Sequence, residues 1–159
     1  MSQESLKKTM ERAGNILSYH ALSAAQLYDR LVEKGESEED AAAVVAKLLQ
    51  LGYLNDLEYA RMLLRQGIGK GYGPARLRQE LRKRKLEPDA IDLAMEDYQT
   101  DGDKLIGYIR QKLRGDPAPD RAAIKRVTDG LFRKGYSWDE IDSALRRYLE
   151  ETAEEQERG

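Results

Sequence analysis

The chain has 159 residues, of which 40% are hydrophobic and 35% charged, with a net charge of −2, which suits one ordinary domain or a short array of small modules. It contains no cysteine and one histidine, His20, so the composition excludes disulfides and thiolate- or histidine-rich metal sites and favours a cytoplasmic location. No window approaches the roughly 18 apolar residues that a membrane-spanning helix needs, so we expect no membrane partner.

Residues 1–54 carry the signals of a first group of helices. Ser23 and Gln26 have the spacing of a capping box, which begins a helix, and Gly35 suits the left-handed position after its end. Apolar residues at helical spacing then continue up to Gly52. We predict a first helical repeat in this range.

Residues 55–100 form a second group. Asn55 and Glu58 again have capping-box spacing, and Pro74 and Pro88 suit the first positions of two further helices. Patterns typical of β-strands are almost missing here, as in the rest of the chain. We predict a second, basic helical repeat at the centre of the chain.

The stretch "GIGKGYG", residues 67–73, has a glycine at every second position. It follows a predicted helix over residues 57–65 and lacks the strand and the Gly-Lys-Ser/Thr ending of a phosphate-binding loop, so nucleotide binding is disfavoured. Glycines permit positive φ and close backbone approach. We therefore predict a sharp turn between two helices over residues 66–73, after which Pro74 begins a basic helix.

Residues 101–151 form a third group, which an acidic tail follows up to Gly159. Gly135 suits a helix end, and Ser137 with Glu140 has the capping-box spacing of a final helix start. We expect the acidic tail to fray as a solvated helix end.

The sequence also repeats itself with a period of about 50 residues. A shift of this size places residues 77–98 on residues 127–148 without a gap, and places residues 27–45 on residues 77–95 with a weaker match. The first shift pairs Leu81 with Leu131, Ile91 with Ile141, and Ala94 with Ala144. We predict an all-α fold of three tandem three-helix-bundle repeats in an elongated, curved array; the alternative is chance similarity among amphipathic helices.

The net charge hides a strong segregation along the chain. Residues 1–60 contain six basic and ten acidic residues, residues 61–85 contain nine and one, and residues 86–159 contain 12 and 18. Phosphates would repel the acidic ends and attract only the centre. Any contact with a polyanion is therefore expected to be local.

Two motifs in the centre carry a resemblance to a known family. The stretch "GYLNDLEYA", residues 52–60, precedes "KGYGPARLRQEL", residues 70–81, by a short interval. This pair resembles the RecX family of bacterial regulators of the RecA recombinase, and the resemblance covers residues 20–148. The family fold, three tandem three-helix repeats, is similar to the one that the 50-residue period suggests.

The resemblance implies a protein without catalysis or cofactor that lodges in the helical groove of the RecA filament on single-stranded DNA. In the family this dampens ATP hydrolysis, strand exchange and the co-protease activity of RecA. The expected partners are the RecA filament and single-stranded DNA, contacted directly or through RecA, and we expect a monomer. No metal site is expected, and no nucleophile–base pair or carboxylate couple has recognisable spacing for an enzyme.

The basic centre supplies the candidate binding residues. Arg78, Arg82 and Lys85 lie at spacings of four and three on the predicted helix, whereas Leu77 and Leu81 face inward. Nine basic residues with one acid repel one another unless an anionic surface approaches, although a merely solvated surface is the alternative. The predicted partner- or nucleic-acid-binding residues are Arg61, Arg65, Lys70, Tyr72, Arg76, Arg78, Arg82, Lys83, Arg84 and Lys85.

Two rival functions stay open at this point. One is a helical DNA-binding module that acts directly on DNA through the basic central repeat, and the other is a structural adaptor for unrelated proteins. Tyr72, on the glycine stretch, could stack on a base, insert between RecA subunits or simply pack. The remaining aromatic residues considered are assigned to the core: Tyr53, Tyr98, Tyr136, Tyr148 and Trp138.

Overall fold

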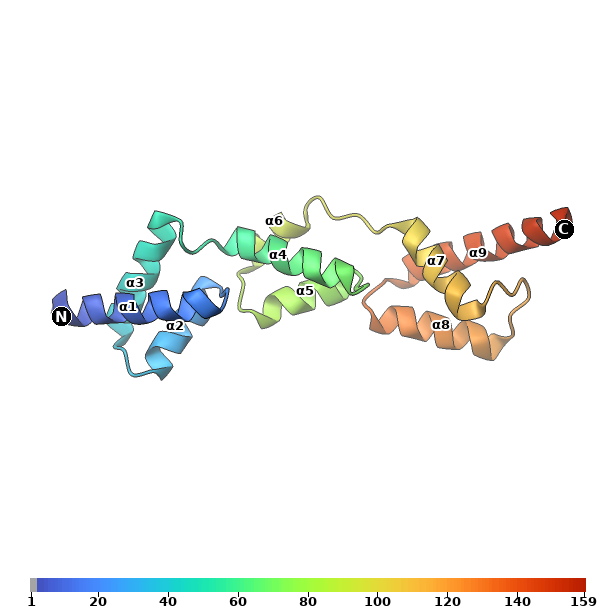
Figure 1. The fold of residues 1–159 in the computed structure, drawn as a ribbon. Coiled ribbons are helices and arrows are strands. Elements are labelled where there is room, and N and C mark those ends of the chain that lie inside the picture. The colour runs from blue at the N-terminus through green and yellow to red at the C-terminus, as the bar shows by residue number, and fades with distance from the viewer. Residues whose placement is uncertain (1–2) are drawn as a thin grey trace. The chain divides into compact units, whose positions relative to one another are not determined.

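The computed structural model describes residues 3–159, and all regular elements in that range are α-helices (Figure 1). In chain order they are α1 Gln3–Tyr19, α2 Ala24–Glu33, α3 Glu38–Leu51, α4 Asp56–Gly69, α5 Pro74–Lys83, α6 Pro88–Met95, α7 Gly102–Leu113, α8 Arg121–Arg133 and α9 Trp138–Arg158. These nine helices of the described range confirm the predicted all-α fold.

The helices are organised in threes along the chain. Helices α1, α2 and α3 contact one another, and so do α7, α8 and α9, while α4, α5 and α6 lie between these groups in sequence. The predicted repeat boundaries after residues 54 and 100 fall in the connections that precede α4 and α7. They stay a prediction.

Residue contacts divide the chain into two compact units. Unit 1 comprises Met1–Gln66 and Gln79–Asp97, and unit 2 comprises Gly67–Arg78 and Tyr98–Gly159. Helices α4 and α5 therefore contribute residues to both units.

The predicted helix starts are present. Ser23 and Ser137 each form a complete capping box, with Gln26 and Glu140 as the reciprocal residues. Asn55 accepts a hydrogen bond from the backbone N–H of Glu58 at 3.1 Å. Helices α5 and α6 begin at prolines, as predicted. These signals are local, which is why the sequence alone reveals them.

The predicted turn over residues 66–73 is shorter in the structure, because α4 continues through Gly69. Gly67 lies inside the helix, where an added Cβ would come within 2.4 Å of Leu77 Cδ2, so its missing side chain makes room for a leucine. The turn itself consists of the four residues from Lys70 to Gly73, and Gly71 has a φ of +82°.

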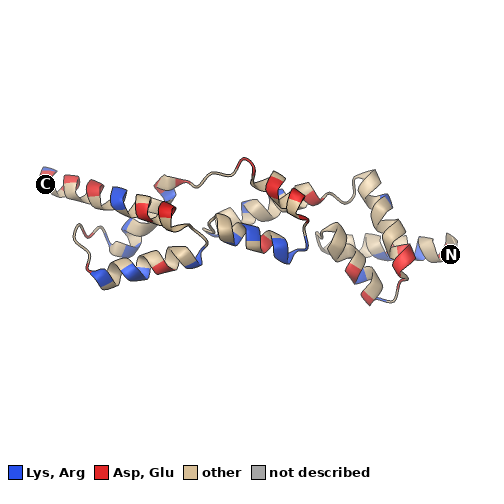
Figure 2. Ribbon diagram, turned by 180° about the vertical axis from the view of Figure 1, so that it is seen from behind, with Lys and Arg blue, Asp and Glu red and all other residues tan. Residues whose placement is uncertain are grey.

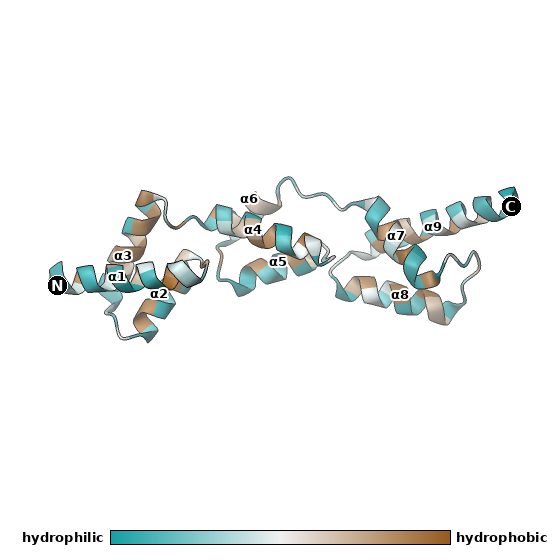
Figure 3. Ribbon diagram, in the orientation of Figure 1, coloured by the Kyte–Doolittle hydropathy of each residue, from teal (hydrophilic) through white to brown (hydrophobic). Residues whose placement is uncertain are grey.

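Each unit has its own apolar core. In unit 1 the core includes Leu27, Leu31 and Val44, which are at most 1% exposed. Helix α3 is mostly brown in Figure 3 because apolar residues fill most of its length. In unit 2 the core includes Ile109 and Tyr148, both with no exposed surface. The two cores bury the helical faces that the apolar periodicity predicted.

A junction between a turn and a helix start occurs once in each unit. In unit 1, Ser23 Oγ donates to the carbonyl of Arg84 at 2.6 Å. In unit 2, the backbone N–H of Gly73 donates to the carbonyl of Lys134 at 2.7 Å, and that of Ala75 donates to the carbonyl of Gly135 at 3.0 Å. Ser23 and Gly73 are 50 residues apart, as are Arg84 and Lys134. The sequence period therefore corresponds to a repeated contact.

The turns that follow α2, α5 and α8 share a positive φ at equivalent positions. The values are +99° at Gly35, +58° at Lys85 and +101° at Gly135. The two larger angles suit glycine alone, whereas +58° is the left-handed region that other residues can enter at some cost. The central turn thus accommodates a lysine where its counterparts need glycine.

Ser23→Ala is expected to destabilise unit 1 by about 1–2 kcal/mol, because the change removes the cap of α2 and the hydrogen bond to the Arg84 carbonyl together. The matched control is Ser37→Ala, which removes only the cap bond that Asp40 N donates at 3.1 Å. Urea unfolding followed by circular dichroism compares the two variants. Equal losses would show that the junction bond contributes nothing.

The acidic tail is helical rather than frayed, since α9 continues to Arg158. Arg110 of α7 contacts Glu151 at 3.4 Å and Glu155 at 3.1 Å, which ties this extension to the third bundle, formed by α7, α8 and α9. The hydrogen bond to Glu155 is the main cause that raises the pKa of Arg110. The expectation of a fraying end is therefore wrong.

The aromatic residues assigned to the core divide into two groups. Tyr148 is fully buried, and Tyr98 and Tyr136 are half-buried. Tyr53 and Trp138 are 75% and 51% exposed, so their assignment to the core is wrong. Trp138 stacks on Phe132 with 4.8 Å between ring centroids, and this partner replaces the predicted core packing.

Candidate functional site

The ten predicted binding residues are spread over four consecutive segments. Arg61 and Arg65 lie on α4, Lys70 and Tyr72 lie in the glycine turn, four residues from Arg76 to Lys83 lie on α5, and Arg84 and Lys85 follow that helix. Six of the ten belong to unit 1, whereas Lys70, Tyr72, Arg76 and Arg78 belong to unit 2.

The part in unit 1 is exposed and only weakly paired. Arg61 lies 3.8 Å from Glu58, and Lys83 lies 3.6 Å from Glu80; in both pairs the partner is three residues away on the same helix. Such surface pairs contribute little to stability. Two more arginines are exposed and have no carboxylate within 4.0 Å in the described part of the chain, namely Arg65 and Arg82.

The predicted stripe of Arg78, Arg82 and Lys85 does not form along one helix. Helix α5 ends at Lys83, and Lys85 turns away with its positive φ to contact Asp29. The hydrogen bond to Asp29 raises the pKa of Lys85, so this side chain stays protonated. Of the three residues in the predicted stripe, only Arg78 and Arg82 lie on α5.

Arg84 is held by unit 1 itself. Its guanidinium donates to the hydroxyl of Tyr59 at 3.1 Å, and its carbonyl accepts the hydrogen bond of the junction. The side chain is exposed, and the hydrogen bond to Tyr59 orients it. Arg84 can therefore present positive charge without first being ordered by a partner.

Tyr72 is the centre of the part in unit 2. The Arg76 guanidinium lies 4.3 Å from the centroid of the Tyr72 ring, and Lys70 Nζ lies 6.0 Å from it. Arg76 also donates to the Tyr72 hydroxyl at 3.4 Å. An aromatic ring with two nearby cations can take part in stacking and in charge recognition.

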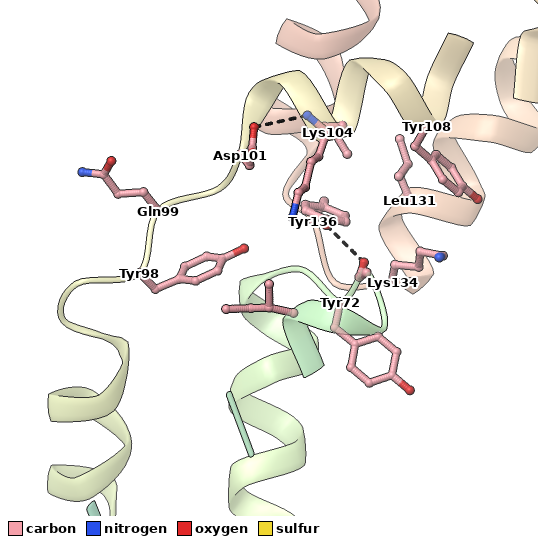
Figure 4. Close-up of a pocket in the computed structure, with 12 residues that line it drawn as sticks. Tyr72, Tyr98, Gln99, Asp101, Lys104, Tyr108, Leu131, Lys134 and Tyr136 are labelled. Carbon is pink, nitrogen blue, oxygen red and sulfur yellow. Dashed lines mark hydrogen bonds between the residues drawn. The ribbon is translucent and has the colours of Figure 1, made fainter. Parts of the chain in front are cut away.

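A pocket of about 230 Å³ lies next to this turn in unit 2 (Figure 4). Tyr98 and Tyr136 contribute aromatic walls, and burial raises the pKa of both hydroxyls. The Tyr136 hydroxyl donates to the carbonyl of Gly71 at 3.1 Å, which fixes the glycine turn against the third bundle. In the figure the Tyr72 ring points away from Tyr136.

Within residues 3–159 no three metal-binding side chains gather. None of the helices described is both long and apolar enough to cross a membrane. The chemistry that the described side chains offer at the candidate site is positive charge, aromatic surface and hydroxyl groups.

A second cationic segment lies outside the predicted set. Residues 101–137 contain nine basic and five acidic residues, whereas residues 138–159 contain three and eight. When residues 86–159 are counted as one block, the acidic residues of the flanking segments mask the positive charge of residues 101–137. A count by predicted helix would have found it.

The comparisons with known proteins agree with the repeat organisation. The first three-helix domain of RecX matches residues 10–48, and the second three-helix domain of RecX matches residues 55–95. The chain belongs to the RecX family. Among the curated RecX relatives, the regulatory protein RecX of Vibrio campbellii is 35% identical over 85% of this chain and 88% of its own length. That of Stenotrophomonas maltophilia strain R551-3 is 33% identical over 86% of this chain and 85% of its own.

Solved RecX structures share the fold. The crystal structure of RecX from Lactobacillus salivarius superposes with a TM-score of 0.84 at 22% identity and covers 94% of this chain and 99% of its own. A second crystal structure, of regulatory protein RecX, gives a TM-score of 0.76 at 23% identity over 89% of this chain and 72% of its own. The predicted family and the predicted three-helix repeats are thus confirmed.

Proposed function

We propose that this RecX protein is a non-catalytic regulator, mainly an inhibitor, of the RecA recombinase. It binds in the groove of the RecA filament on single-stranded DNA and dampens ATP hydrolysis, strand exchange and co-protease activity. It works in the cytoplasm, as a monomer and without a cofactor. Membership in a family of regulatory proteins supports the regulatory role.

The observation that carries the proposed contact is the set of exposed cations in the basic centre. Arg65 and Arg82 have no acidic neighbour within ion-pair distance in the described range, and Arg84 is held in place by Tyr59. Unpaired positive charges repel one another and favour contact with an anionic surface. In the filament groove, either carboxylates of RecA or phosphates of DNA provide one.

The double variant Arg65→Glu, Arg82→Glu is expected to raise the concentration needed for half-inhibition about 5- to 30-fold. Each exposed contact is worth up to about 1 kcal/mol, and reversal adds repulsion. The measurement is the ATPase rate of RecA on single-stranded DNA as the full chain is titrated in. Both arginines lie in unit 1 and neither is buried, so the variant should keep its helical circular dichroism.

Lys7→Glu, Lys8→Glu is the matched control, because it makes the same change in charge on exposed residues of α1, also in unit 1. We expect this control to inhibit like the wild type. If both double variants inhibit equally, the central arginines are not the contact. If the wild type leaves the ATPase rate unchanged at every concentration, inhibition itself is refuted.

A further inference from the structure

The face of unit 2 formed by α7 and α8 carries several cations around one aromatic ring. The Tyr108 ring centroid is 5.6 Å from Lys112 Nζ and 4.9 Å from Lys134 Nζ. Arg126 and Arg133 of α8 line a surface pocket of about 300 Å³ together with Tyr108 and Lys112. We call these five residues the Tyr108 cluster.

The cations of the Tyr108 cluster lack acidic partners. Across residues 3–159, no carboxylate lies within 4.0 Å of the four side chains concerned, Lys112, Arg126, Arg133 and Lys134. The pocket lining contains two arginines and a lysine and no acid. Four like charges gathered on one face repel one another, and for these side chains no ion pair within 4.0 Å offsets that repulsion in the described range.

Other cations of the same unit behave differently. Arg110 contacts Glu151 and Glu155, Lys125 contacts Asp129 at 2.7 Å, and Arg146 contacts Asp142 at 3.0 Å. Figure 2 shows the same division, with blue residues frequent on α8 and red residues frequent on α9. Acids are therefore available in this unit, but in the described range none of them lies within 4.0 Å of a cation of the Tyr108 cluster.

The floor of the pocket is apolar. Leu113 and Val127 line it and are only 6% and 7% exposed, because they also belong to the core of unit 2. The site thus combines an apolar floor, an aromatic ring and a rim of positive charge. A ligand that matches all three features carries both a planar apolar group and negative charge.

We propose that the Tyr108 cluster binds single-stranded nucleic acid, with a base stacked on Tyr108 and the neighbouring phosphates on its lysines and arginines. A duplex hides the faces of its bases, and an acidic peptide would use the cations but not the ring. Single strands present both groups at each nucleotide. This proposal deepens the proposed function, on which it rests for the presence of single-stranded DNA.

The same strand can reach a second aromatic ring within unit 2. Lys134 Nζ lies 3.3 Å from the position that a Cβ at Gly71 would occupy, so this lysine lies beside the glycine turn. The next residue, Tyr72, has Arg76 at 4.3 Å from its ring centroid. Lys134 therefore lies between Tyr108 and the turn that carries Tyr72, and we include Tyr72 in the proposal as a second candidate stacking position.

The test measures binding of a short fluorescein-labelled oligothymidylate to the full chain by fluorescence anisotropy, in the absence of RecA. Tyr108→Leu is expected to weaken binding about 5- to 150-fold, the loss of one stacked base. Tyr108→Phe keeps the ring and should bind like the wild type. If Leu and Phe at this position bind equally, stacking on Tyr108 is refuted.

The salt dependence tests the phosphate contacts. Arg126→Gln, Arg133→Gln should lower the slope of log K against log salt by about 1.4, since two contacts to a single strand are lost. Arg146→Gln, Arg158→Gln removes two charges from α9 in the same unit and should leave the slope unchanged. Equal slopes for the two double variants, or competition by polyglutamate as strong as by unlabelled oligothymidylate, would overturn the proposal.

The two proposals fail in distinguishable ways. Loss of oligothymidylate binding by Tyr108→Leu with normal inhibition of the RecA ATPase would support the nucleic-acid site and show that the inhibitory contact lies elsewhere. If the wild type inhibits RecA but does not bind oligothymidylate, the site proposed here is refuted and the regulatory role stands. Binding of oligothymidylate without inhibition would refute the proposed function alone.

Discussion

Gly135→Ala is expected to destabilise unit 2 by about 2–5 kcal/mol. Gly135 has a φ of +101°, and an added Cβ would lie 2.4 Å from Arg76 N and 2.5 Å from Arg76 Cβ. These atoms belong to the backbone and to the base of a side chain, so they cannot swing away. The junction must open, which breaks the hydrogen bond from Ala75 N to the Gly135 carbonyl.

The fluorescence of Trp138 measures this loss, because it is the sole tryptophan and lies in unit 2. Gly107→Ala is the matched control, since its Cβ would meet no atom within 4 Å and it lies within α7 of the same unit. The control should gain up to about 1 kcal/mol, the difference in helix propensity. Equal denaturation midpoints for the two variants would contradict the tight junction.

Tyr148→Ala is expected to destabilise the third bundle by about 3–5 kcal/mol, as for other large aromatic side chains truncated in a core. Tyr148 has no exposed surface, and its hydroxyl donates to the carbonyl of Asp116 at 2.6 Å. The substitution leaves a cavity and an unpaired carbonyl. Scanning calorimetry should show a melting temperature lower by about 6–20 °C.

Two variants separate packing from hydrogen bonding at this position. Tyr148→Phe should lose only about 1 kcal/mol, because the ring stays and one hydrogen bond is removed. Tyr53→Ala removes a tyrosine that is 75% exposed and should change stability by no more than about 0.5 kcal/mol. Losses at Tyr53 as large as those at Tyr148 would contradict the burial described.

The sequence predicts the fold well where the determinants are local. Capping boxes, prolines at helix starts and glycines after helix ends act within a few residues of one another, so Ser23, Ser137 and Pro74 could be assigned without a structure. The extension of α4 through Gly69 could not, because it depends on Leu77 packing against Gly67 from another helix. Tertiary contact there keeps a glycine inside a helix, although glycine disfavours helix interiors.

The aromatic residues show the same limit. Tyr148 lies within α9 and Tyr53 lies in the connection after α3; the first is buried and the second is exposed. Which face of a helix end is covered depends on how the next helix packs, and residue type does not determine that. Trp138 is half-exposed because Phe132 covers one of its faces from α8.

The candidate site was only partly predictable. A charge count over residues 61–85 finds the basic centre, but it does not reveal that Lys85 leaves the helix for Asp29 or that Arg84 bonds Tyr59. The Tyr108 cluster joins side chains from α7 and α8 with one from the following turn. Residues so far apart in sequence come together only through the packing of the third bundle.

The two junctions differ in how far their residues can be substituted. In unit 1 a serine hydroxyl spans the gap to the Arg84 carbonyl, so the backbones stay apart and the turn tolerates a lysine at position 85. In unit 2 two backbones meet at Gly73 and Gly135, where a single methyl group would collide with main-chain atoms 2.7 Å or less away. Position 85 in the junction of unit 1 can therefore vary, whereas the junction of unit 2 restricts positions 73 and 135 to glycine.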